Sequence, residues 1–78
     1  MVRKLENVDE MGFVEIAEAY PNDYILVKIV EMDYLKGRFR GIPWFTSDLR
    51  KELLIKGEEK ETTVLEGINL MPIIGGLL

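Results

Sequence analysis

The sequence predicts a small single α+β domain in the order helix, strand, strand, helix, strand, followed by an apolar C-terminal tail. Three observations lead to this prediction. Residues 24–30 (YILVKIV) are rich in β-branched and aromatic side chains, which are typical of a buried strand. Residues 13–20 place apolar side chains at the spacing of an amphipathic helix. Residues 68–78 contain no charged side chain.

Length and composition limit how this domain can be stabilised. A chain of 78 residues buries only about 60% of the surface that it exposes when unfolded, so its core is small. There is no cysteine and no histidine, which excludes disulfides and argues against a zinc site. We therefore expect no metal and no cofactor, and stabilisation by tight packing or by association with a second copy.

The balance of 47% apolar and 31% charged residues is typical of a folded domain. No run approaches the roughly 20 apolar residues that cross a bilayer. The basic pair Arg3 and Lys4 is not followed by the apolar stretch of a signal peptide. We expect a cytoplasmic protein with no membrane partner.

The first helix is expected to follow an N-terminal segment of residues 1–8. Asn7 is a candidate N-cap with Glu10 as its reciprocal partner, and Asp9 is a competing N-cap. Pro21 ends this helix, because proline cannot continue the hydrogen-bond ladder.

An antiparallel hairpin comes next, with strands at residues 24–31 and 38–46 and with Gly37 supplying a positive φ in the loop. Pro43 lacks a ladder donor, which predicts an edge strand or a bulge. A third strand at residues 62–66 can lie beside the first strand and make it central. The sheet is expected to carry the helices on one face.

Residues 46–48 (TSD) offer three N-cap candidates for a second helix that ends at Gly57. The domain body then spans residues 9–66, and residues 67–78 form an apolar tail or an extra strand. The gain from burying the tail nearly cancels the cost of ordering it, so its placement stays open. The candidate oligomer interface in this tail comprises Ile68, Leu70, Met71, Ile73, Ile74, Leu77 and Leu78.

Charge is distributed unevenly along the chain. Residues 1–35 carry a net charge of −5, residues 36–56 of +4, and residues 57–78 of −3. Attraction between these segments, within one chain or between two, is one interpretation. The other is a polyanion-binding patch on the basic and aromatic strand, formed by Lys36, Arg38, Arg40 and Trp44.

The residue types argue against catalysis. Without cysteine and histidine, neither a Cys-His pair nor a Ser-His-Asp triad can form. Asp23, Asp33 and Asp48 stand where turns and helix caps favour aspartate. Ser47 is the only serine, and the sequence identifies no base beside it. We expect a protein that is not an enzyme.

Part of the chain resembles a loose group of short, uncharacterised prokaryotic proteins. The resemblance rests on residues 20–26 (YPNDYIL), on the strand and Gly-Arg hairpin after them, and on Ser47-Asp48 at the start of a helix. The resemblance covers about residues 20–57 and leaves out the apolar tail. It implies a fold pattern and no activity.

Three functions remain as hypotheses. The first is a non-catalytic protein-interaction module that self-associates, as a homodimer, through the tail. The second is single-stranded nucleic-acid binding through residues 36–46, which the net negative charge opposes. The third is a small regulatory partner of another protein, with the tail as its docking arm.

Overall fold

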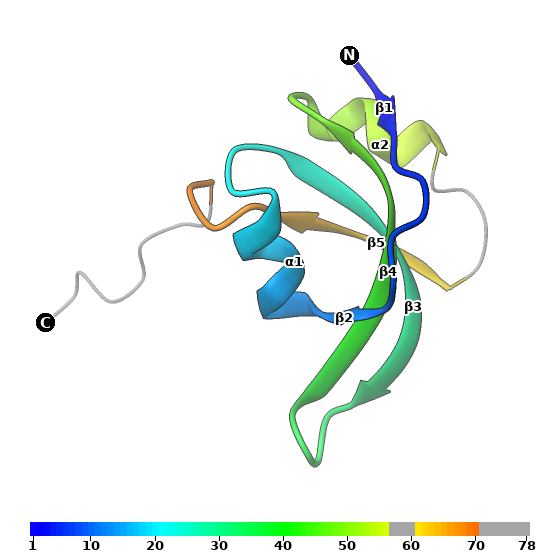
Figure 1. Ribbon diagram of the computed structural model, residues 1–78, viewed down its shortest axis with the longest axis vertical. Helices are drawn as coiled ribbons and strands as arrows, with labels where there is room; N and C mark the ends of the chain where they lie inside the picture. The colour runs from blue at the N-terminus through cyan, green and yellow to red at the C-terminus, as the bar shows by residue number, and fades with distance from the viewer. Residues whose placement is uncertain (57–60, 71–78) are drawn as a thin grey trace, which may run out of the picture.

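The computed structural model describes residues 1–56 and 61–70 and shows a single α+β domain built around an antiparallel sheet (Figure 1). The predicted fold class is confirmed. The elements are β1 (Arg3–Lys4), β2 (Met11–Gly12), α1 (Phe13–Ala19), β3 (Tyr24–Asp33), β4 (Arg38–Ser47), α2 (Arg50–Lys56) and β5 (Thr62–Glu66).

Strand β3 is the centre of the sheet, as its composition predicts. It pairs with β4 on one side and with β5 on the other, so the third predicted strand does lie beside the first. Ile25, Leu26 and Val27 are at most 1% exposed. Because successive strand residues point to opposite faces, burial of all three means that both faces of β3 are covered.

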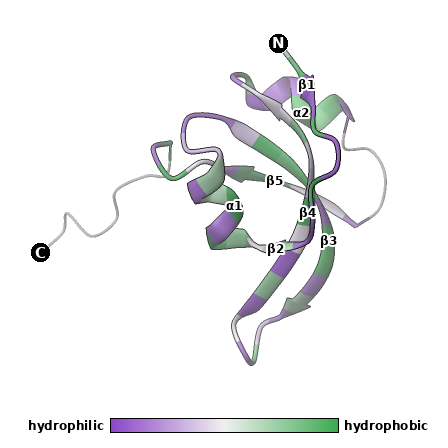
Figure 2. Cartoon of the chain, viewed as in Figure 1, coloured by the Kyte–Doolittle hydropathy of each residue, from purple (hydrophilic) through white to green (hydrophobic). Residues whose placement is uncertain are grey.

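The two helices cover opposite faces of the sheet, so the expectation of helices on one face is wrong. Ile16 of α1 packs with Ile25 and Val27 in one buried cluster. Leu26 points the other way and lines a pocket with Leu54 of α2. Both faces of β3 are apolar in its first half, so each face needs a helix to cover it. Figure 2 shows hydrophobic residues where β3, β4 and β5 come together and hydrophilic bands along the far end of the hairpin.

The N-terminal segment forms β structure instead of the predicted helix cap. β1 pairs with β4 near Phe45 and β2 pairs with β4 near Gly41, while α1 begins only at Phe13 and has no side-chain N-cap bond. Asn7 has a positive φ of 57° and lies outside the helix. The predicted caps at Asn7, Glu10 and Asp9 are therefore wrong, because Met11 and Gly12 pair with β4 and the helix begins only after them.

Strand β4 is not an edge strand, since β3 lies on one side of it and β1 and β2 on the other. The alternative prediction, a bulge, is confirmed: the register with β3 shifts between Leu26 and Val27, opposite Phe45 and Pro43. Pro43 also falls between the stretch paired with β1 and the stretch paired with β2. Its missing donor thus lies where the ladder is already interrupted.

Gly67 lets the chain after β5 dock closely on the turn between α1 and β3. A Cβ on Gly67 would lie 2.2 Å from the backbone oxygen of Tyr20 and 2.6 Å from that of Pro21. The docked stretch is held by backbone bonds from Gly67 N to Asp23 O (2.9 Å), Ile68 N to Ala17 O (3.0 Å) and Asn69 N to Pro21 O (2.8 Å). A glycine at position 67 is therefore a packing requirement.

Gly67→Ala is expected to lower the free energy of unfolding by about 2 kcal/mol or more, because the backbone atoms that meet the new Cβ cannot swing away as side chains do. Urea unfolding followed by circular dichroism measures this loss. Gly37→Ala is the control, since Gly37 has a φ of 65° but no atom within 4 Å of its Cβ position. Its cost comes from the positive φ alone, about 1–2 kcal/mol. Equal losses in the two variants would contradict the crowding at Gly67.

Candidate functional site

The structure separates the four residues of the predicted polyanion patch. Arg38 and Arg40 line one pocket of about 380 Å³ between α1 and the β3–β4 hairpin. Trp44 lies in the bulge and lines a different pocket. Lys36 stands in the hairpin loop, where its backbone N–H donates to Asp33 Oδ1 at 3.1 Å. The four residues thus do not line a single pocket.

Two aromatic side chains, Phe13 and Phe39, line the Arg38–Arg40 pocket. The rings of Phe13 and Phe39 stack with centroids 5.9 Å apart, and Tyr34 meets Phe39 edge-on at 5.3 Å. These contacts join α1 to the far end of the hairpin. Phe39 therefore packs against Phe13 and Tyr34, as a small sheet requires.

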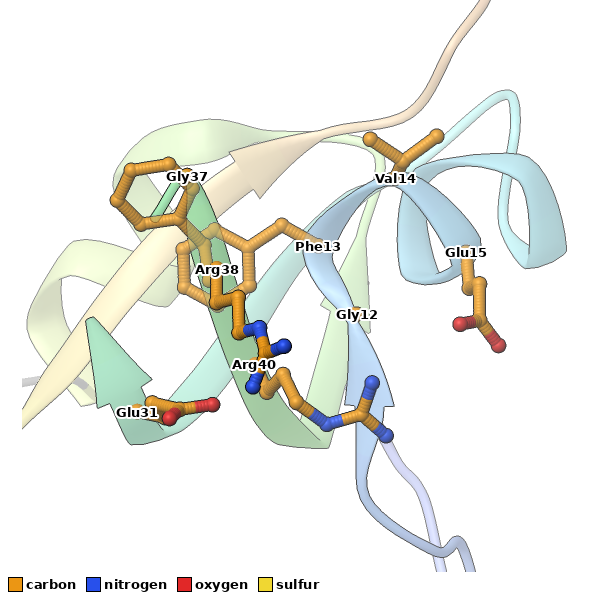
Figure 3. Close-up of a pocket in the computed structure, with 9 residues that line it drawn as sticks. Gly12, Phe13, Val14, Glu15, Glu31, Gly37, Arg38 and Arg40 are labelled. Atoms are coloured by element: carbon orange, nitrogen blue, oxygen red, sulfur yellow. The ribbon is translucent and has the colours of Figure 1, made fainter. Parts of the chain in front are cut away.

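Acidic side chains surround Arg40. Its Nε donates to Glu10 Oε2 at 2.7 Å, and in Figure 3 the Arg38 and Arg40 side chains lie between Glu31 and Glu15. The pKa of Arg40 is raised, first by the Glu10 hydrogen bond and further by the charges of Glu10, Glu15 and Glu31. The charge of Arg40 is thus balanced within the chain. This pairing of the acidic first segment with the basic centre matches the interpretation of attraction within one chain.

The candidate acid–base residues serve turns and helix starts. Asp33 Oδ1 accepts the backbone N–H groups of Leu35 and Lys36, both at 3.1 Å. Asp48 accepts a 2.7 Å bond from the amino group of Met1. Asp23 engages Gly67 through its backbone oxygen. Within residues 1–56 and 61–70 there is no cluster of three acidic side chains that could hold a metal ion.

Ser47 does have a carboxylate beside it, which sequence reasoning missed. The buried Ser47 hydroxyl donates to Glu52 Oε1 at 2.6 Å and accepts the backbone N–H of Leu49 at 3.0 Å. The spacing of five residues is longer than that of a capping box, so the sequence pattern does not indicate this contact. Both contacts bind the start of α2 to the end of β4.

The described part of the tail folds back on its own chain. Asn69 Nδ2 donates to Asn22 Oδ1 at 2.8 Å, in addition to the backbone bonds of the docked stretch. Ile68 and Leu70 remain 48% and 37% exposed. The other predicted interface residues, Met71, Ile73, Ile74, Leu77 and Leu78, lie outside the described residues.

Among the described strands, none pairs with the outer edge of β5. Two backbone hydrogen bonds, from Ile29 N to Glu61 O (2.6 Å) and from Gly67 N to Asp23 O (2.9 Å), show which residues of β5 bond to β3. In an antiparallel pair the residues that bond to the neighbour alternate with those that do not. The backbone groups of Thr63 and Leu65 therefore point to β3, and those of Val64 and Glu66 point away from it.

A shallow groove beside this edge separates β5 from α2. Its volume is about 230 Å³, and its lining includes Arg50, Leu54 and Val64. Leu54 and Ile55 are 51% and 73% exposed. No ion pair of Arg50 or Glu66 is found in the part of the chain that the structure describes.

Comparisons with known proteins identify no relative. No family model, no curated protein and no solved structure matches the chain. Among the described residues there is also no helix with the length and apolar character that crossing a membrane requires. The resemblance to short prokaryotic proteins stays a prediction.

The Ser47–Glu52 contact predicts a pH-dependent contribution to stability. The pKa of Glu52 is lowered from 4.5, first by the Ser47 hydroxyl and then by the Met1 amino group. A carboxylate with a lowered pKa stabilises the fold above its unfolded pKa, and this contribution disappears as the pH falls through the folded pKa. The stability difference between the wild type and Glu52→Gln is thus expected to be full near neutral pH and to vanish in strong acid.

Urea midpoints measured from neutral pH into the acid range test this expectation. In a Ser47→Ala background the pH-dependent difference should shrink, because the main cause of the lowered pKa is gone. A difference that stays constant with pH would show that the Glu52 charge does not contribute.

Proposed function

We propose that this chain is a non-catalytic interaction module that self-associates by pairing the β5 edge of one copy with the β5 edge of another. The observation that supports it most is the outward direction of the Val64 and Glu66 backbone groups on an edge strand that no other described strand pairs with. A second strand can satisfy these groups directly.

The two edges of the sheet differ in how well they resist such pairing. β1 and β2 are two-residue strands, and β1 consists of Arg3 and Lys4. Short strands and lysines are features that natural proteins use to prevent edge pairing. β5 has five residues, no proline and one charged side chain, Glu66 at its end. Pairing is therefore expected at β5.

Antiparallel pairing of two β5 strands is self-complementary when Val64 faces the partner's Val64. This register sets Glu66 beside the partner's Thr62 and keeps the two Glu66 carboxylates apart. Thr62 and Arg50 line the same groove, and Glu66 shares the α2 face because it lies opposite Tyr24 in the ladder. The partner's Glu66 thus approaches Arg50 with opposite charge.

The same twofold arrangement brings the two α2 helices to one side of the joined sheet. The exposed Leu54 side chain of each copy then faces the seam, where it loses contact with water. This apolar contribution favours a second copy over an extended peptide that carries no helix.

Val64→Pro is expected to convert the dimer into a monomer, because proline removes the outward N–H while leaving the bonds of Thr63 and Leu65 to β3 in place. Light scattering after size exclusion measures the mass. Val64→Ala is the matched control; it keeps the N–H and should remain dimeric. A wild-type monomer would refute the proposal. A dimer that survives Val64→Pro but is lost in a chain ending at Leu70 would assign the interface to the tail instead.

Charge reversal tests the proposed register. Glu66→Lys should weaken the dimer by placing two cations together, and Arg50→Glu should weaken it by placing two anions together. The double variant restores opposite charges and should recover most of the lost affinity, which sedimentation equilibrium can measure. Additive losses in the double variant would rule out this register.

A further inference from the structure

The bulge in β4 turns two successive aromatic side chains toward one pocket. In a regular strand Trp44 and Phe45 would point to opposite faces of the sheet. The register shift places Phe45 opposite Leu26 and Pro43 opposite Val27, which leaves Trp44 as the extra residue. Both aromatic residues now line the same pocket, of about 640 Å³, with the N-terminal segment as its other wall.

Three lysines from three different elements border these rings. Lys28 Nζ of β3 lies 5.6 Å from the centroid of a Trp44 ring, and Lys56 Nζ of α2 lies 5.4 Å from the Phe45 centroid. Lys4 of β1 stands opposite Phe45 in the ladder and lines the pocket. All three lysines are exposed, and no ion pair of theirs is found in residues 1–56 and 61–70. Glu6 is the acidic residue of the pocket lining.

We propose that this Trp44–Phe45 surface binds single-stranded nucleic acid, with unpaired bases stacking on the two rings and phosphates contacting the three lysines. Aromatic side chains with adjacent cations are the elements of single-strand binding surfaces. A base that stacks on Trp44 displaces the Lys28 ammonium from the ring, and the flexible lysine stem lets it reach the neighbouring phosphate.

The shape and the charge of the surface favour this ligand over its alternatives. Trp44 and Phe45 are partly buried in a pocket, so they can reach a base that is splayed out but not one inside a duplex. The surface also differs from the Arg38–Arg40 pocket, where acidic groups of the chain already balance Arg40. The proposal does not depend on self-association, because all its residues belong to one copy.

Trp44 is the only tryptophan, so its fluorescence reports directly on stacking. Titration with an oligothymidylate of about ten nucleotides, within the site sizes of single-strand binding folds, should quench this fluorescence at low salt. Three phosphate contacts predict a slope of log K against log salt of about −2, at roughly 0.7 per contact. An absence of quenching at low ionic strength would overturn the proposal.

Lys28→Gln should weaken binding about eightfold at roughly 50 mM salt and reduce the slope by about 0.7, because one phosphate contact is lost. Arg38→Gln is the matched control, since it removes one exposed cation from the other pocket; affinity and slope should stay unchanged. The reverse pattern would overturn the assignment to this surface. A poly-glutamate peptide should not quench Trp44, and equal quenching by it would show a general polyanion site without base stacking.

Discussion

The fold depends on the burial of β3 from both sides. Ile25, Leu26 and Val27 are almost fully buried, and each such side chain contributes on the order of 1.5–3 kcal/mol. A sheet alone cannot cover both of its faces, so α1 and α2 are required on opposite sides. Helices of seven residues are unstable in isolation, which means that they form because β3 gives them an apolar surface to cover. The helices and the strand therefore stabilise each other, and a substitution that removes buried side-chain volume from β3 destabilises the packing on both faces of the sheet.

The close approach of β4 to β3 links the packing of the core to the position of the surface residues of β4. A Cβ on Gly41 would lie 2.4 Å from Val27 Cγ1 and 2.6 Å from the Lys28 backbone oxygen. The two paired strands therefore approach each other so closely that only glycine fits at this position. The bulge at Trp44, three residues further on, changes the direction of the strand and of the Trp44 side chain. Bulges commonly redirect a side chain beside a functional site, at the cost of an interrupted ladder. The same irregularity thus accommodates Pro43 and creates the surface formed by Trp44 and Phe45.

The sequence was informative where structure is determined by neighbours along the chain. The central strand, the positive φ at Gly37 and the bounds of the strand at residues 62–66 follow from local patterns, and all agree with the structure. The predicted cap at Asn7 failed because pairing of β2 with β4, about 30 residues away, decides where the helix begins. The residues of the predicted basic patch lie close together in sequence, but Arg38 and Arg40 line one pocket while Trp44, in the bulge, lines another. Glu10 in addition pairs with Arg40.

The two proposed surfaces are compatible in one assembly. A twofold axis normal to the sheet at Val64 keeps the α2 face of both copies on the same side. Phe45, which lies under Lys56 of α2, and Trp44, under Lys28, open on that face. The two aromatic surfaces of a dimer would then look in one direction, and a single strand long enough to reach both would bind the second as an intramolecular step. Edge pairing would thereby give two nine-kilodalton chains together an avidity that one copy lacks.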